Sequence, residues 1–113
     1  MFFSKYKKVD LRTDFNTILS FFDGVKYCHL YFTFEAPWVK KDLDEKCIGE
    51  NLPISFLHQR LFVGDSSFDL DILSNNDISV YTHKESEIII RIKRGYNYGS
   101  YTYYRIVKST ASK

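Results

Sequence analysis

The stretch RIKRGYNYGSYTYYRIVK, Arg91 to Lys108, decides the fold because it has the residue pattern of a β-hairpin. A three-residue loop suits its centre, since such loops take a residue with positive φ at their third position, and Gly99 does so without steric cost. Counting outward from this loop sets Ile92 opposite Tyr104, on a face that is apolar on both strands. Because register follows the buried face, the sequence predicts this pairing and not one shifted by a single residue.

The opposite face of this hairpin is basic and aromatic. The predicted register puts Arg91 beside Arg105, and like charges directly opposite each other on a sheet are unfavourable. Something must therefore offset the repulsion: acids of the chain itself, the phosphates of a nucleic acid, or an acidic partner protein. A surface for single-stranded nucleic acid, with phosphates on the cations and bases stacked on the rings, would use Arg91, Lys93, Tyr101, Tyr103 and Arg105.

Charge is unevenly distributed along the chain, although its 113 residues carry a formal net charge of only +2. Residues 61–87 contain six acids and one lysine, whereas residues 88–113 contain six bases and no acid. Such a division can serve a function, or it can hold two parts of one sheet together. In the second case, the acids expected to face the two arginines are Asp69, Asp71, Glu85 and Glu87.

Before the hairpin, the residue pattern changes from helical to strand-like. One apolar stripe at helical spacing predicts a helix over about residues 11–23, ended by Gly24; its members are Leu11, Phe15, Ile18, Leu19 and Phe22. Alternating apolar and polar residues with short turns then predict strands. These strands cover about residues 25–36, 54–63, 67–73, 78–83, 87–95 and 100–108, with a charged loop at 37–53. Residues 54–63 also fit a helix.

One helix followed by antiparallel strands predicts an α+β fold. We expect a single domain over residues 1–113, with the N-terminal helix packed on a mostly antiparallel sheet of five or six strands. The sheet would be a meander, and the even spacing of its strands also fits a small barrel. No apolar run reaches the roughly 20 residues that a bilayer requires, and no signal peptide is recognisable, so we expect a cytoplasmic protein without membrane association.

Candidate catalytic groups are few. His29, His58 and His83 could supply the acid and base of a small nuclease if the fold brought two of them together. Cys28 lies on the apolar side of its strand and is expected in the core, whereas Cys47 lies in the charged loop; two cysteines do not define a disulfide framework. Because no nucleotide, hydrolase or zinc motif is present, we expect no enzyme activity, metal site or cofactor.

Aromatic and acidic residues offer a surface for a partner protein. Trp38 in the charged loop, and Tyr27 and Tyr31 on the outward side of a strand, are candidate anchors, because such rings bury a large area in interfaces. Asp69 and Asp71 share one strand face and could imitate phosphates toward a basic partner such as a nuclease. In this general profile the chain resembles toxin-immunity and inhibitor proteins. We therefore expect a small non-enzymatic module that binds and neutralises another protein.

Overall fold

The computed structural model describes residues 6–36, 44–71, 77–93 and 101–109. In chain order, the elements are β1 (Lys7–Val9), α1 (Phe15–Phe21), β2 (Tyr27–Thr33), β3 (Lys46–Leu57), β4 (Arg60–Val63), β5 (Ser66–Asp69), β6 (Ile78–His83), β7 (Glu87–Lys93) and β8 (Tyr101–Lys108). The expected α+β character is confirmed, since one short helix accompanies a mostly antiparallel sheet.

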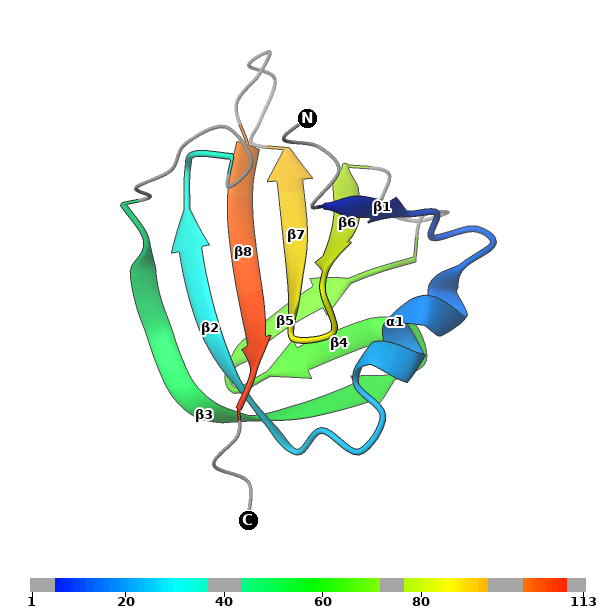
Figure 1. Ribbon diagram of the computed structural model, residues 1–113, viewed down its shortest axis with the longest axis horizontal. Coiled ribbons are helices and arrows are strands. Elements are labelled where there is room, and N and C mark those ends of the chain that lie inside the picture. Colours follow the sequence, from blue (N-terminus) through cyan, green and yellow to red (C-terminus); the bar gives the residue numbers. More distant parts are fainter. Residues whose placement is uncertain (1–5, 37–43, 72–76, 94–100, 110–113) are drawn as a thin grey trace.

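The sheet has eight strands in the order β1-β6-β7-β8-β2-β3-β4-β5 (Figure 1). Every neighbouring pair is antiparallel. The predicted number of five or six strands is therefore wrong. The sheet is open, with β1 and β5 as its two edges among the described residues, so the barrel alternative is wrong as well.

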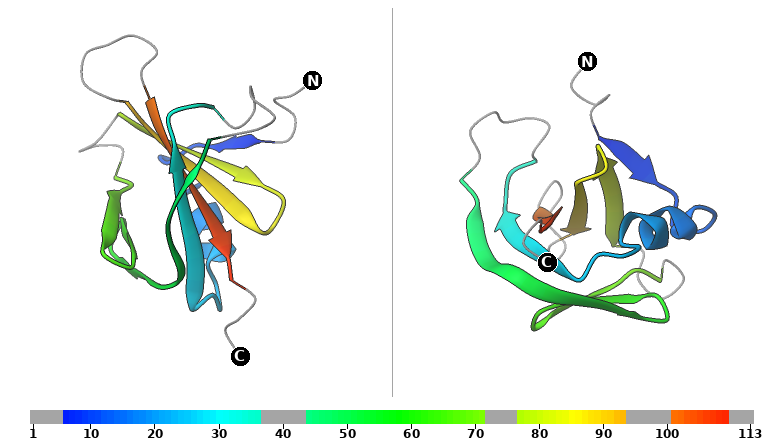
Figure 2. Two further views of the ribbon diagram at one scale, coloured as in Figure 1. Left: turned by 90° about the vertical axis from the view of Figure 1, so that its left-hand side faces the viewer. Right: turned by 60° about the horizontal axis from the view of Figure 1, so that its bottom comes forward.

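β3 carries the chain from one layer of the fold to the other. It pairs with β2 as far as Pro53 and with β4 from Ile54 onward. Two register shifts interrupt the first pairing, and Asn51 has a φ of 51°, a left-handed conformation that asparagine adopts more readily than most residues. Because bulges bend a strand and increase its twist, β3 curves around the core and places β4 and β5 in a second layer (Figure 2).

The core fills the space between the two layers. Its first layer consists of the alternate apolar residues of the long strands, namely Cys28, Leu30, Ile78, Val80, Ile88, Ile90 and Ile106. The second layer contributes Leu61, Val63 and Phe68. At the open side of the curved sheet, α1 adds Ile18 and Phe21, and the ring centroid of Phe15 lies 6.4 Å from that of Phe56 in β3. The helix thus covers the sheet, as its apolar stripe indicates.

The helix is shorter than predicted and begins later. Asp10 accepts backbone hydrogen bonds from Thr13 and Asp14 at 3.2 and 2.7 Å, which makes a turn of the segment predicted as the first helical turn. Leu19, predicted to belong to the apolar stripe, is 40% exposed. Gly24 has a φ of 76°, the left-handed conformation expected of a residue that terminates a helix.

One predicted segment is wrong in type, and another is divided into two strands. The charged loop at 37–53 contains the first half of β3, which escapes pattern recognition because most of its residues are exposed on both faces. Residues 54–63 form neither one strand nor a helix: β3 ends at Leu57, His58 takes a φ of 57° in a two-residue turn, and β4 begins at Arg60. Several other strands differ from the prediction at their ends; β2, for example, is shorter than the predicted 25–36. The short edge strand β1 is absent from the prediction.

The register of the C-terminal hairpin differs from the prediction by two residues. Ile92 lies opposite Thr102, not Tyr104, and Arg91 lies opposite Tyr103, not Arg105. A shift of two residues keeps every side chain on its predicted face, because side chains alternate with a period of two. The predicted three-residue loop falls on residues 94–100, which lie outside the described residues.

Candidate partner-binding face

One face of the first layer points away from the core and carries six of the residues singled out in the sequence, namely His29, Tyr31, His83, Arg91, Tyr103 and Arg105. We call it the outer face. It consists of His29, Tyr31 and Thr33 in β2, Ser79, Tyr81 and His83 in β6, Glu87, Ile89 and Arg91 in β7, and Tyr103, Arg105 and Val107 in β8. The strand registers line these side chains up in rows that cross four strands. One row runs Tyr81, Ile89, Arg105 and Tyr31, and the next runs Ser79, Arg91, Tyr103 and Thr33.

Arg105 is neutralised by the chain's own carboxylates. Its Nε and Nη2 donate to the two carboxylate oxygens of Glu45 at 2.9 Å each, and its Nη1 donates to Glu87 at 3.3 Å. The guanidinium also lies 4.6 Å from the ring centroid of Tyr31. The hydrogen bonds that Arg105 donates to Glu45 raise the pKa of Arg105, although burial alone would lower it. This arginine is therefore a structural residue at the centre of the outer face.

Among the described residues, Glu87 is the one of the four expected acids that contacts Arg91 or Arg105 through an ion pair or hydrogen bond. Glu87 contacts Arg105, but Asp69 lies 3.9 Å from Arg60 in the second layer. The main carboxylate, Glu45, comes from the segment just before β3 and lies 60 residues from Arg105 in the chain. No local pattern in the sequence indicates this pair.

Arg91 has a different environment from Arg105. It lies 4.3 Å from the ring centroid of Tyr101 and 5.7 Å from that of Tyr81, and it donates to the Ser79 hydroxyl at 3.4 Å. No described carboxylate lies within 4.0 Å of it. Burial raises the pKa of Tyr103. The charge of Arg91 and its hydrogen bond with Tyr103 partly offset this increase. The tyrosines of the predicted nucleic-acid surface thus hold an arginine on this face.

The predicted partner-binding residues do not converge on one surface. Tyr27 and Tyr31 are on the outward side of β2, whereas Asp69 and Asp71 belong to the second layer, where the intervening Leu70 is buried and the acids point away from the core. The two pairs therefore face different sides of the molecule. Trp38 lies outside the described residues.

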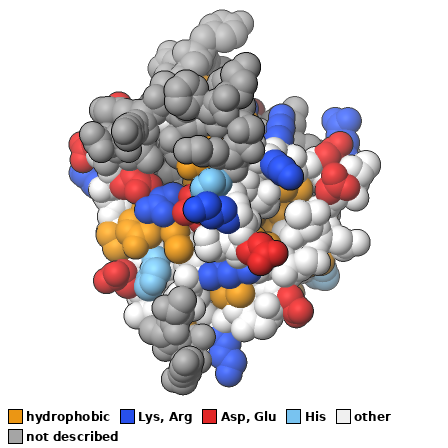
Figure 3. All heavy atoms as spheres, in the orientation of Figure 1, with side chains coloured by type: hydrophobic (Ala, Val, Ile, Leu, Met, Phe, Trp, Pro, Cys, Tyr) orange, Lys and Arg blue, Asp and Glu red, His pale blue; other side chains and the backbone are white. Residues whose placement is uncertain are grey.

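Exposed apolar side chains are spread along β2 and β3 instead, from the first layer to the second. The large hydrophobic residues that are most exposed are Leu19 (40%), Tyr27 (40%), Phe34 (57%), Ile48 (43%) and Leu57 (62%). All but Leu19 belong to β2 or β3 or, for Phe34, directly follow β2. In Figure 3, hydrophobic side chains cluster at the side of the molecule where β2 and β3 run, bordered by charged and histidine side chains. Sequence reasoning missed Phe34, Ile48 and Leu57, because their exposure depends on which strand edges remain uncovered.

The histidines are not brought together. His83 pairs with Glu87, Glu87 with Val107, and Val107 with His29, so the two histidines lie at the ends of one row across four strands. At about 4.8 Å between strands, they are about 14 Å apart. That separation is too large for two imidazoles to act on one phosphate. His58 lies in the turn between β3 and β4.

The two cysteines are free and lie in opposite environments. Cys28 is fully buried, and burial raises the pKa of its thiol to about 11. Cys47 is exposed on β3, next to Tyr31 of β2.

These environments predict selective alkylation. With a small excess of iodoacetamide at pH 8, we expect one adduct by mass spectrometry, located on Cys47 by peptide mapping, because the thiolate is the reactive form and Cys28 is both buried and protonated. The second adduct should appear only in denaturant. Equal labelling of both thiols in the folded protein would contradict the buried position of Cys28.

Comparisons with known proteins add no assignment, since no family profile, curated protein or solved structure matches the chain. Within the described residues, no group of three His, Cys, Asp or Glu side chains could hold a metal ion. None of the described helices is long and apolar enough to cross a membrane.

Proposed function

We propose that this chain is a non-enzymatic protein-binding module that neutralises a partner protein in the cytoplasm, in the manner of toxin-immunity and inhibitor proteins. The observation that carries the proposal is that four of the five most exposed large hydrophobic residues lie on β2 and β3 or directly follow β2. Large apolar side chains that stay exposed on adjacent elements are typical of protein interaction sites. Tyr27 and Ile48 are the anchors that we assign to this surface.

The surroundings of these anchors support a protein partner. Asp44 and Glu50 are exposed near Ile48 in the chain, and charged groups beside an apolar anchor are typical of the polar rim of an interface. Glu45 fixes Arg105, and Arg105 in turn holds the ring of Tyr31. Side chains that are held in place before binding lose less entropy when a partner docks.

The free edge of β3 favours recognition through side chains. Its first half pairs with β2 alone among the described strands, which leaves its other edge without a strand partner there. The two register shifts in this half distort the edge, and bulges of this kind discourage the addition of a further strand. We therefore expect the partner to contact the anchors and not to extend the sheet.

The test is binding of an isolated partner to surface variants. A partner would be captured from the native host with the tagged chain, purified, and titrated by calorimetry. We expect Tyr27→Ala with Ile48→Ala to weaken binding by about 30-fold or more, the effect of losing a principal anchor. Leu19→Ala is the matched control, because it removes a side chain of similar exposure on α1.

The acids of the second layer provide the competing surface. If Asp69→Asn with Asp71→Asn abolishes binding while the β2 and β3 variants bind normally, the partner docks on the second layer and our assignment of the surface is wrong. If every variant binds the purified partner as tightly as the wild type does, none of these surfaces takes part in binding. The proposed neutralising function then loses its support.

A further inference from the structure

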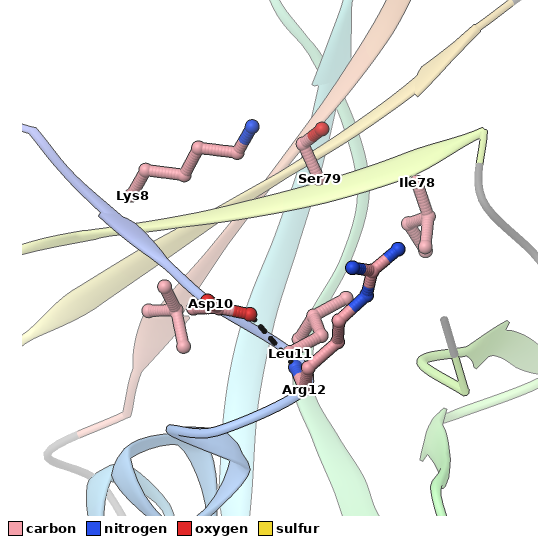
Figure 4. Close-up of a pocket in the computed structure, with 7 residues that line it drawn as sticks. Lys8, Asp10, Leu11, Arg12, Ile78 and Ser79 are labelled. Atoms are coloured by element: carbon pink, nitrogen blue, oxygen red, sulfur yellow. Dashed lines mark hydrogen bonds between the residues drawn. The ribbon is translucent and has the colours of Figure 1, made fainter. Parts of the chain in front are cut away.

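The pocket beside β1 does not gather its polar groups around one point. It has a volume of about 410 Å³ and lies where β1 separates from β6. Figure 4 shows the amino end of Lys8 near Ser79 on one side of β6, and the guanidinium of Arg12 on the other side. Asp10 accepts a hydrogen bond from the backbone N–H of Arg12 at 3.0 Å, which stabilises the turn after β1. These four residues therefore do not form one site.

Polar contacts do converge at the bulge of β3, where this strand begins to bend. One residue of β2, His29, lies opposite two residues of β3, Glu50 and Asn51, because the pairing of the two strands shifts there by one residue. Asn51 takes the left-handed conformation, with a φ of 51°. The extra residue of a bulge is left out of the regular ladder. Its backbone groups therefore require other hydrogen-bond partners.

His29 supplies one of these partners. The backbone N–H of Asn51 donates a hydrogen bond to Nδ1 of His29 at 3.2 Å. A backbone N–H can only donate, so Nδ1 must carry a lone pair, and the imidazole is neutral with its proton on Nε2.

The side chain of Asn51 connects the same bulge to the end of β8. Its carboxamide oxygen accepts a hydrogen bond from the hydroxyl of Ser109, a buried residue that directly follows β8. The backbone N–H of Ser109 in turn donates to the carbonyl oxygen of Tyr27 at 3.1 Å. Asn51 thus links β2, β3 and the end of β8, and its backbone contact depends on the protonation state of His29.

We propose that the hydrogen bond between His29 and Asn51 is a pH-sensitive latch that holds the bulge of β3 and the end of β8. Protonation places a hydrogen on Nδ1, so that two donors face each other and the hydrogen bond is lost. Imidazole is the side chain that ordinarily changes its charge between pH 5 and pH 8. The latch is therefore closed at the upper end of this range and opens as the pH falls through it. Opening releases the backbone of Asn51 and loosens its contact with Ser109.

The other charged groups around His29 titrate outside this range. Carboxylic acids ordinarily titrate near about pH 4, thiols near about pH 8.5 and tyrosines near about pH 10, so a transition between pH 7.5 and pH 5 belongs to a histidine. Arg105 is bound to Glu45 and Glu87, and Lys108 points to the opposite face, where its Nζ lies 4.3 Å from the ring centroid of Phe21. The titratable and charged residues toward this side of the sheet are Tyr27 and Tyr31 in β2, Cys47 and Glu50 in β3, Glu87 in β7 and Arg105 in β8.

The test follows nuclear magnetic resonance signals of the free chain from pH 7.5 to pH 5. At pH 7.5, the nitrogen-15 shifts of the His29 ring should show the proton on Nε2. As the pH falls, the backbone amide signals of Asn51 and Ser109 should move with the same midpoint as the ring signals of His29. Urea denaturation supplies the energetic measurement. Relative to His29→Asn, the unfolding equilibrium constant of the wild type should rise about threefold between pH 7.5 and pH 5, the size expected for one hydrogen bond.

Two variants serve as matched controls. His29→Asn keeps an acceptor that does not titrate, because its Oδ1 occupies the same place along the side chain as Nδ1, so its Asn51 amide should show no transition in this range. His58→Asn removes the imidazole of the turn between β3 and β4, where a φ of 57° suits asparagine, and should leave the transition of Asn51 unchanged.

Two results would overturn the proposal: an Asn51 amide that does not move at the midpoint of His29 in the wild type, or one that moves equally in His29→Asn. The wild-type titration requires no variant to fold, so the first result is decisive by itself. The inference goes beyond the proposed protein binding and is tested on the chain alone. Its failure is therefore distinct from a failure of the anchors Tyr27 and Ile48 to bind a partner.

Discussion

Replacing Ile106 with alanine should destabilise the protein by about 3 to 4 kcal/mol. Ile106 is fully buried in β8, the strand that lies between β7 and β2. It faces Ile88 on one side and Leu30 on the other, and both are fully buried as well. The substitution leaves a cavity among residues that strands on both sides hold in place, so the surroundings can relax only partly. Urea denaturation of the wild type and the variant measures the difference.

Ile48→Ala is the control for this prediction. It deletes the same atoms from a residue that is 43% exposed on β3, so the expected loss is under about 1 kcal/mol. The slope of the unfolding transition should be the same in both variants, because the surface exposed on unfolding is nearly unchanged. If Ile106→Ala costs no more than Ile48→Ala, β8 does not occupy the centre of the sheet.

The faces of the C-terminal hairpin could be predicted from sequence, whereas the pairing of its strands could not. Alternation assigns Ile88, Ile90 and Ile106 to the core and Arg91 and Arg105 to the outer face, and the structure agrees. A shift of two residues leaves every side chain on the same face, however, so alternation does not reveal it. The length of the connecting loop decides which residues of the two strands lie opposite each other. The predicted clash between the two arginines came from this ambiguity. In the structure Arg91 faces Tyr103, and Ile89 faces Arg105.

β3 shows why the candidate surface was only partly predictable. Its first half pairs with one neighbour and is solvated on both faces, so it lacks the alternation by which strands are recognised. Without that strand, neither the exposed Ile48 nor the contact of Glu45 with Arg105 can be anticipated. The same holds for the edge strand β1, whose three residues pair with β6 some 70 residues later in the chain.

Arg105→Ala should cost about 2 to 3 kcal/mol, because it removes the counter-charge of two carboxylates that are largely buried. The side chains of Glu45 and Glu87 are only 16% and 17% exposed, so neither can be fully hydrated when the guanidinium is absent. Arg60→Ala provides the comparison: its pair with Asp69 spans 3.9 Å, and the arginine side chain is 49% exposed. Exposed pairs of this kind contribute little, so we expect a loss below about 0.5 kcal/mol.

A double-mutant cycle then isolates the contact between Arg105 and Glu45. If the bidentate pair holds the outer face together, Arg105→Ala combined with Glu45→Ala should cost about 1 to 2 kcal/mol less than the sum of the single variants, because the second change removes a carboxylate that already lacks its partner. Additive losses would mean that the two side chains do not stabilise each other. Arg105 would then be available to a ligand, and the basic, tyrosine-rich surface would again be a candidate for nucleic-acid binding. Strong coupling instead assigns Arg105 to the architecture of the outer face.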